Sequence, residues 1–252
     1  MLSRGFCESL KSEFDHQGYV VIREFLNADG IEDLRRQVVR YLENVVPRIP
    51  QRDVYREKAG DDRSIKQLIR MNQYDEYFAE LLASELFVSV AELLLAGSVI
   101  GKNIQWFNKP AGLSRATPPH QDGFYLMLEP NEAVTMWLAL DDVGEDNGCM
   151  RYVAGSHNKS LRRHERTDTL GFSQAIPDYG TEDQLNEVAV TAVPGDLLVH
   201  HSLTIHRCDE NRSEKKRRAL GLLYYSARSV EDTARVREYS RNLDAELAHR
   251  IG

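Results

Sequence analysis

The chain has 252 residues, of which 42% are hydrophobic and 28% charged, a composition typical of globular proteins that excludes a wholly disordered chain. Its 32 basic and 39 acidic residues give a net charge of −7, which excludes the strongly basic surface of a nucleic-acid-binding protein. Three cysteines are too few for a disulfide framework and lead us to expect a cytoplasmic protein. We expect neither a membrane span nor a signal peptide, because no apolar run reaches about 18 residues and the N-terminus lacks an apolar segment.

The first part of the chain has the apolar periodicity of helices. The elements that we expect there are, in order, a helix over 1–16, a strand over 19–22, a helix over 28–46, an irregular loop over 48–62, a stretch at 65–71 that fits a strand or a helix, and two helices within 74–95. In 28–46, apolar residues recur at intervals of three and four positions, which predicts an amphipathic helix that buries Leu34, Val38 and Leu42. Asn27 can cap the start of this helix.

The chain changes in character after residue 98, where short β-rich runs follow one another between turn-forming residues. These runs are 99–107, 121–128, 133–140, 150–153, 188–193, 197–201, 203–208 and 218–226. Many short strands at such intervals predict an all-β sandwich or barrel. A long polar insertion occupies 157–187, and 230–251 returns to a helical composition.

The boundary near residue 98 is a shift in composition and has no features of a linker. We therefore expect a single domain over 1–252. In this domain, 1–97 would supply mostly helical support, 98–228 the β-barrel core, and 229–252 a C-terminal helix. The predicted fold class is mainly β with flanking helices.

The pattern with the clearest chemistry is His120-Gln121-Asp122. On a strand, residues i and i+2 project from the same face, so an imidazole and a carboxylate would point into one space. A later strand could return His206, 84 residues after Asp122, to the same space. Two histidines and one carboxylate on one face form the facial triad of non-haem Fe(II) oxygenases. Alone, a His-x-Asp pair is a weak signal, because such pairs often occur by chance at surfaces.

Arg217 lies 11 residues after His206, beyond a polar stretch that resembles a turn. A guanidinium fixed there could clamp a carboxylate with two hydrogen bonds. The dicarboxylate that chelates iron at one end and meets an arginine at the other is 2-oxoglutarate. The alternative is that Arg217 belongs to a solvated basic run, Lys215–Arg218, and the residues alone favour neither interpretation.

Four segments, in this order and spacing, resemble the phytanoyl-CoA dioxygenase family of Fe(II)- and 2-oxoglutarate-dependent oxygenases. They are GYVVIREFLNADGIEDLRRQV, PHQDGFYL, MWLALDDVGEDNGCMRYVAGSH and PGDLLVHHSLTIHRCDENRSEKKRRAL. The resemblance implies a double-stranded β-helix, a jelly-roll or cupin-like barrel. It also implies a dioxygenase that uses Fe(II), 2-oxoglutarate and O₂, hydroxylates a small molecule and releases succinate and CO₂, with ascorbate helpful in vitro.

Carried over residue by residue, the resemblance also implies a set of site residues. The set comprises the iron ligands His120, Asp122 and His206, the co-substrate arginine Arg217, and the pocket residues Trp137, Gln105 and Lys66, the last two on a looser alignment. One departure is Cys208, which stands where the family often has a small hydroxyl residue. A carboxylate ligand, Asp122, favours hydroxylation over halogenation, because it occupies the position that a halide would need.

Three histidines compete for the distal ligand position. His200 and His201 end the predicted strand 197–201, where alternation turns one inward and the other outward. His206 has the family's spacing to Arg217 and is the predicted ligand. His201 is then expected to support a ligand or to pack in the core.

Two other classes of protein remain open at this stage. One is a cupin-like metal enzyme that keeps the three ligands but does not use 2-oxoglutarate. The other is a β-barrel binding protein without catalysis. The combination of the three ligands with Arg217 argues against both. The expected partner is a small-molecule substrate of unknown identity, with neither nucleic acid nor membrane, and the expected assembly is a monomer or a homodimer.

Overall fold

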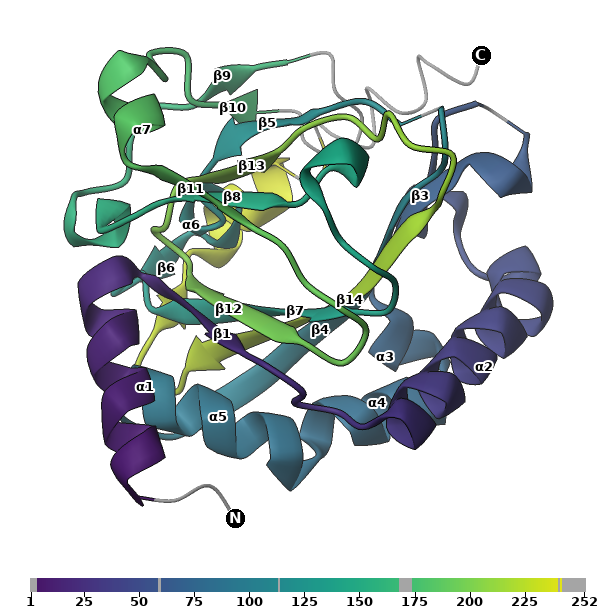
Figure 1. Ribbon diagram of the computed structural model, residues 1–252, viewed down its shortest axis with the longest axis horizontal. Coiled ribbons are helices and arrows are strands. Elements are labelled where there is room, and N and C mark those ends of the chain that lie inside the picture. The colour runs from purple at the N-terminus through teal and green to yellow at the C-terminus, as the bar shows by residue number, and fades with distance from the viewer. Residues whose placement is uncertain (1–3, 59, 113, 168–173, 240, 242–252) are drawn as a thin grey trace.

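Two antiparallel sheets face each other in the computed structural model, which describes residues 4–58, 60–112, 114–167, 174–239 and 241 (Figure 1). The large sheet contains, in spatial order, β1 (Tyr19–Ile22), β12 (Leu197–His201), β7 (Ala133–Ala139), β14 (Arg217–Ser226), β4 (Val99–Lys109), β3 (Ile65–Leu68) and β2 (Val54–Arg56). The small sheet contains β11 (Glu187–Val190), β8 (Met150–Val153), β13 (His206–Cys208) and β5 (Thr117–His120). Two short pairs complete the strands, β9 (Glu165–Arg166) with β10 (Gln174–Ala175) and β6 (Leu128–Glu129) with β15 (Val230–Glu231).

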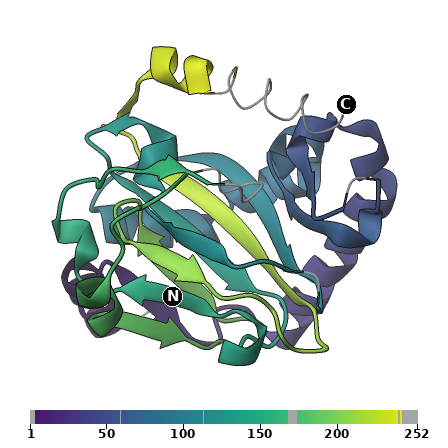
Figure 2. The ribbon, with the colours of Figure 1, turned by 90° about the horizontal axis from the view of Figure 1, so that it is seen from above.

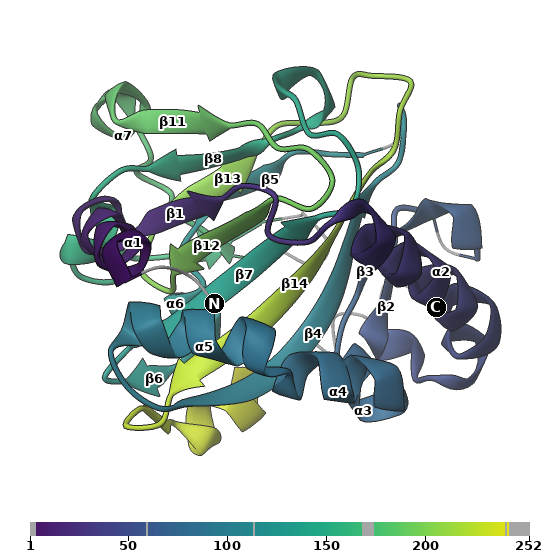
Figure 3. The same cartoon turned by 60° about the horizontal axis from the view of Figure 1, so that its bottom comes forward.

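Helices cover the outer face of the large sheet, as Figure 3 shows for α4 and α5. These helices are α1 (Arg4–Gln17), α2 (Ala28–Asn44), α3 (Met71–Tyr74), α4 (Glu76–Ala83) and α5 (Glu85–Leu95). Two short helices, α6 (Gly123–Leu126) and α7 (Thr181–Leu185), lie elsewhere. Five short 3-10 turns lie at Val46–Arg48, Gln51–Asp53, Asp62–Ser64, Glu145–Asn147 and Ser156–Asn158. A further helical stretch, 233–239, follows β15. Figure 2 shows it in yellow beside the segment that carries α6, and Tyr239 contacts the ring of Tyr125 in α6.

Alternation along β7 explains how the two faces of the large sheet differ. Val134, Met136 and Leu138 are fully buried and pack against the helices. Trp137 and Ala139 point the other way, into a second core that they share with residues of the small sheet. The space between the sheets is therefore lined by the odd-numbered residues of β7.

The amphipathic helix predicted over 28–46 is confirmed as α2. Asn27 caps it, and its side chain accepts a hydrogen bond from the Gly30 nitrogen at 2.9 Å. Leu34 and Val38 are buried, while Leu42 is partly buried against the same core. The burial of this stripe anchors α2 to the large sheet.

The predicted mainly β class with flanking helices and two jelly-roll sheets is confirmed, but a closed barrel is not formed. Among the described residues, no strand is hydrogen-bonded into both sheets, so the core is a two-sheet sandwich. The predicted strand 121–128 is wrong, since β5 ends at His120 and α6 starts at Gly123. The predicted loop 48–62 includes β2, and the ambiguous stretch 65–71 begins as β3. The end of the predicted C-terminal helix, residues 240 and 242–252, lies outside the described residues.

Within the residues that the structure describes, no helix is both long enough and apolar enough to cross a bilayer.

Candidate metal centre

Three side chains converge between the sheets. His120 ends β5 and lies directly opposite His206, the first residue of β13. Asp122 follows β5, and its Oδ1 atom is 3.6 Å from His120 Nε2 and 3.7 Å from His206 Nε2. One ligand atom from each of these three residues lies within 4.8 Å of the other two. Two imidazoles and a carboxylate at this separation can hold a divalent transition metal.

Asp122 reaches this position by a different route from the one its sequence pattern suggests. Its backbone is helical, with φ −55° and ψ −35°, so it does not continue the strand from His120. The chain turns into α6 here, and the Gly123 nitrogen donates to the Ser202 carbonyl at 2.8 Å. The turn, and not strand alternation, brings the carboxylate back to the imidazole.

Both histidine rings are oriented by backbone carbonyls. His120 Nδ1 lies 2.8 Å from the Pro118 oxygen, and His206 Nδ1 lies 3.0 Å from the Thr204 oxygen. A carbonyl only accepts hydrogen bonds, so each Nδ1 carries a proton, and each Nε2 is turned toward Asp122. Burial, together with the neighbouring imidazoles, lowers the pKa of His206 well below its usual value. His206 is therefore neutral near pH 7, the form that binds metals.

The carboxylate stays ionised in this surrounding. Burial by itself would raise the pKa of Asp122, but His206, His120 and His200 lower it well below its usual value. The donor set is thus one carboxylate and two imidazoles, which suits a divalent cation such as Fe(II).

The paired histidines of β12 point in opposite directions. His200 is buried between the sheets, with its Nε2 atom 3.2 Å from Asp122 Oδ2. His201 lies on the other face, where its ring contacts Phe14 and its Nδ1 accepts a hydrogen bond from the Leu203 nitrogen. His201 therefore packs in the core, which is one of the two roles expected for it from the sequence. His200 is the histidine that points toward the site.

A cavity of about 450 Å³ opens beside these residues. The four further residues implied by the family resemblance, Lys66, Gln105, Trp137 and Arg217, all line it. Lys66 forms an ion pair with Glu57 at 3.4 Å. The Gln105 side chain accepts a hydrogen bond from Gln67 at 2.8 Å.

Arg217 is a buried cation at the wall of this cavity. It is 3% exposed, and its guanidinium carbon lies 5.0 Å from the centre of the Trp137 ring. Its Nη2 atom is 4.0 Å from Cys208 Sγ, and no carboxylate among the described residues pairs with it. Burial lowers the pKa of this guanidinium. The solvated basic run is thus the wrong alternative for Arg217, which instead fits an anion that enters the cavity.

Sequence reasoning missed two polar residues of the cavity, Lys109 and Thr135, and considered His200 only as a rival metal ligand. Lys109 lies opposite Arg217 in the β4–β14 ladder, is buried, and donates from Nζ to the Arg115 carbonyl at 2.7 Å. Thr135 Oγ1 donates to Asp122 Oδ2 at 2.6 Å. No local motif marks these residues, because strand pairing over long separations brings them to the site.

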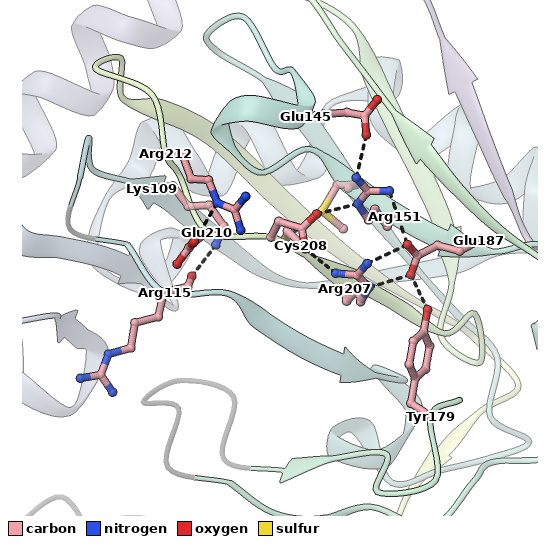
Figure 4. A network of polar contacts seen from close by, with 12 residues as sticks. Lys109, Arg115, Glu145, Arg151, Tyr179, Glu187, Arg207, Cys208, Glu210 and Arg212 are labelled. Carbon is pink, nitrogen blue, oxygen red and sulfur yellow. Dashed lines mark hydrogen bonds and ion pairs between the residues drawn. The ribbon is translucent and has the colours of Figure 1, made fainter. Parts of the chain in front are cut away.

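A network of ion pairs joins side chains of three strands of the small sheet (Figure 4). Arg207 donates to Glu187 at 2.6 and 2.8 Å and to Asp209 at 2.5 Å. Arg151 donates to Asp209 at 2.7 Å, and Tyr179 donates to Glu187. The network ties β8, β11 and β13 together and so holds the strand that carries His206.

We expect Glu187→Ala to lower the free energy of unfolding by about 2–3 kcal/mol. The Glu187 side chain is 7% exposed, and its loss leaves Tyr179 without its acceptor and Arg207 with Asp209 alone. Urea unfolding with an unchanged slope measures the difference. As a control, Glu182→Ala removes an exposed partner of Lys159 and should cost less than about 0.5 kcal/mol. Equal effects of the two substitutions would contradict this expectation.

Comparison with known proteins finds a matching family model, relatives in sequence and a shared fold. The model of the phytanoyl-CoA dioxygenase (PhyH) family matches residues 14–219. A phytanoyl-CoA dioxygenase of Arabidopsis thaliana is 28% identical over 244 residues, which cover 83% of this chain and 85% of that protein. A protein of Stutzerimonas stutzeri is 25% identical over 235 residues, which cover 88% of this chain and 79% of that protein. Its name is probable alpha-ketoglutarate-dependent hypophosphite dioxygenase. The crystal structure of the epimerase SnoN in complex with Fe3+, alpha ketoglutarate and nogalamycin RO superposes with a TM-score of 0.74 at 22% identity, over 91% of this chain and 87% of that one, and shows the shared fold.

Proposed function

The chain belongs to the phytanoyl-CoA dioxygenase family and is an Fe(II)- and 2-oxoglutarate-dependent dioxygenase, and from this premise we propose which of its residues carry the reaction. His120, Asp122 and His206 hold Fe(II). Arg217 binds the distal carboxylate of 2-oxoglutarate, with Trp137 beside it. The substrate is a small organic molecule that is hydroxylated at an unactivated C–H bond, while 2-oxoglutarate is converted to succinate and CO₂.

One observation carries this assignment. Two imidazoles and a carboxylate share one cavity with a buried guanidinium that has no carboxylate partner in the described part of the chain. Burying an unpaired cation is costly, so the position of Arg217 makes sense when a ligand supplies the anion. A cupin-like enzyme that does not use 2-oxoglutarate, or a binding protein, would not require a metal-ligand set and a buried arginine in the same cavity.

The bound iron supplies the oxidising chemistry with O₂ and 2-oxoglutarate. The residues of the chain supply position and environment. Pro118 and Thr204 carbonyls fix the two imidazoles, and Arg217 fixes the far end of the co-substrate. The apolar wall formed by Trp137 and its neighbours keeps water away from the charged groups and so strengthens their interactions.

We also propose that the chain forms one domain over 1–252. Strands β1, β3 and β2 come from the first 97 residues but belong to the same sheet as β4, β7, β12 and β14. Removing them would expose both edges of the sheet that carries Arg217. A cytoplasmic location and a monomer or homodimer remain predictions.

The test of the proposed function is the release of succinate from 2-oxoglutarate by the Fe(II)-loaded protein, with ascorbate present to keep the iron ferrous. We expect slow turnover without substrate and faster turnover with the right member of a library of small organic molecules. Loss of all turnover when a chelator removes the metal is the matched control. A metal-loaded protein that never consumes 2-oxoglutarate would contradict the proposal.

The position of Lys109 predicts how the affinity for 2-oxoglutarate depends on pH. Burial lowers the pKa of Lys109 to about 8, and the groups around it are Cys208, Arg217, Lys66 and Glu57. Below that pH its ammonium adds a second positive charge to the Arg217 end of the cavity, and above it the charge is lost. We therefore expect the affinity for 2-oxoglutarate to fall as the pH rises from 7 to 9, by about tenfold for one charged hydrogen bond.

Anaerobic titration of the Fe(II) protein with 2-oxoglutarate, followed by the charge-transfer band of the complex, measures this affinity at each pH. Lys109→Met should bind weakly at every pH with a flat profile. Lys109→Arg should keep its charge and also give a flat profile. A wild-type profile that matches that of Lys109→Met would show that Lys109 does not act on the co-substrate.

A further inference from the structure

We propose that Thr135 and His200 are positioning residues for Asp122, which hold its Oδ2 atom from the opposite sheet and leave Oδ1 as the single metal-binding oxygen. This inference rests on the proposed function, because it concerns the carboxylate that we assign as a ligand. It goes further in naming two residues that act through Asp122 without touching the metal.

The two oxygens of Asp122 have different surroundings. Oδ2 accepts a hydrogen bond from Thr135 Oγ1 at 2.6 Å and lies 3.2 Å from His200 Nε2. Oδ1 instead faces the Nε2 atoms of His120 and His206, at 3.6 and 3.7 Å. One oxygen is thus tied to the protein, and the other points into the space between the two imidazoles.

The two donors are neighbours on the large sheet. His200 of β12 and Thr135 of β7 are direct cross-strand partners, so their side chains stand side by side on the same face. Asp122 comes from the opposite layer, after β5 of the small sheet. The hydrogen bonds therefore join the two layers at the metal site, and the packing of one sheet on the other sets where the carboxylate lies.

A tyrosine fixes the donor atom of His200. Asp122 Oδ2 only accepts, so His200 Nε2 must carry the proton, and in the neutral ring Nδ1 is then an acceptor. The Tyr152 hydroxyl lies 3.2 Å from this Nδ1 and can donate to it. Tyr152 is fully buried and stacks on Tyr19, with ring centres 4.6 Å apart. The hydrogen bonds from Tyr152 to His200 and from His200 to Asp122 thus favour the His200 tautomer with its proton on Nε2.

This arrangement has a consequence for the metal. A free carboxylate can rotate about its Cβ–Cγ bond and bind a metal through either oxygen or both. Asp122 sits in a helical turn after its strand, so a regular strand backbone does not hold it in place. With Oδ2 tied, Asp122 would offer a bound metal one oxygen and would leave room there for 2-oxoglutarate and O₂.

The experiment compares matched pairs of variants by titration of the metal-free protein with Co(II), followed by the visible absorption of the bound ion. Thr135→Val keeps the shape of the side chain but removes the donor, and Thr135→Ser keeps the donor. His200→Phe removes the ring donor, and His200→Gln keeps an N–H group. Thr191→Val, at an exposed position away from the site, is the control.

We expect Thr135→Val and His200→Phe to weaken Co(II) binding by about 10–100-fold and to change its spectrum, as the loss of a partner of a ligand does. Thr135→Ser and His200→Gln should recover most of the affinity, and Thr191→Val should match the wild type. Because Thr135→Val and Thr135→Ser differ in the hydroxyl donor, recovery in Thr135→Ser also shows that the loss is not a general failure to fold.

Two results would overturn this inference alone. In the first, the wild type binds Co(II), but neither Thr135→Val nor His200→Phe weakens binding or alters the spectrum. In the second, His200→Phe and His200→Gln both lose the metal while both Thr135 variants keep it, which would make His200 a ligand. A wild-type protein that binds no metal would overturn the proposed function as well.

Discussion

Asp122→Ala should abolish Fe(II) binding and, with it, all turnover of 2-oxoglutarate. Asp122 supplies the negative charge of the ligand set, and its Oδ1 atom lies between His120 and His206. Two imidazoles would remain, without an anion to offset a divalent cation. Loss of a residue that only supports a ligand already costs about 10–100-fold in metal affinity, so loss of the ligand itself should cost more than about 100-fold.

Anaerobic Fe(II) titration and succinate release measure the two effects separately. Asp146→Ala, which removes an exposed carboxylate, is the matched control and should leave both unchanged. Thermal unfolding of the metal-free Asp122→Ala variant should resemble that of the metal-free wild type. Fe(II) affinity close to wild type in Asp122→Ala would show that the metal binds elsewhere or with other ligands.

The second large effect concerns Arg217 and the co-substrate. We expect Arg217→Ala to raise the dissociation constant for 2-oxoglutarate by tenfold or more, in line with the 1.5–3 kcal/mol or so of a charged hydrogen bond, while Fe(II) binding stays nearly intact. The distal carboxylate would otherwise lie without a cation in a cavity walled by Trp137. Arg217→Lys should also weaken binding, because an ammonium lacks the planar fork that meets both carboxylate oxygens.

The measurement is the anaerobic titration with 2-oxoglutarate, wild type beside each variant. Lys216→Ala removes an exposed cation of the same basic run and should bind like the wild type. If Arg217→Ala and Lys216→Ala both bound 2-oxoglutarate with wild-type affinity, the co-substrate would have to be held by another residue.

Much of the fold could be predicted from local patterns. The spacing of Leu34, Val38 and Leu42, with Asn27 ahead of them, indicates the helix that the structure contains as α2. Strands β1, β8 and β12 have the bounds that their β-rich runs indicate. Such elements are predictable because each is set by the period of its own apolar residues.

The prediction of a strand over 121–128 was wrong for a physical reason. The apolar residues after Gly123 suit a strand as well as a short helix, and local propensity cannot choose between them. The choice is made by a distant partner, since the Gly123 nitrogen bonds to the Ser202 carbonyl and starts the turn into α6. The same turn directs Asp122 toward the metal centre.

The sequence by itself determined the type of chemistry, because four segments, in their order and spacing, resemble one family, and the model of that family matches residues 14–219. Only the tertiary structure decided which groups surround them. Thr135, His200 and Lys109 have no motif, and the registers of β12 with β7 and of β14 with β4 place them at the site. The apolar pattern of a strand fixes which of its faces is buried, but its partner strand lies far away in the sequence, so the strand's own residues do not identify that partner.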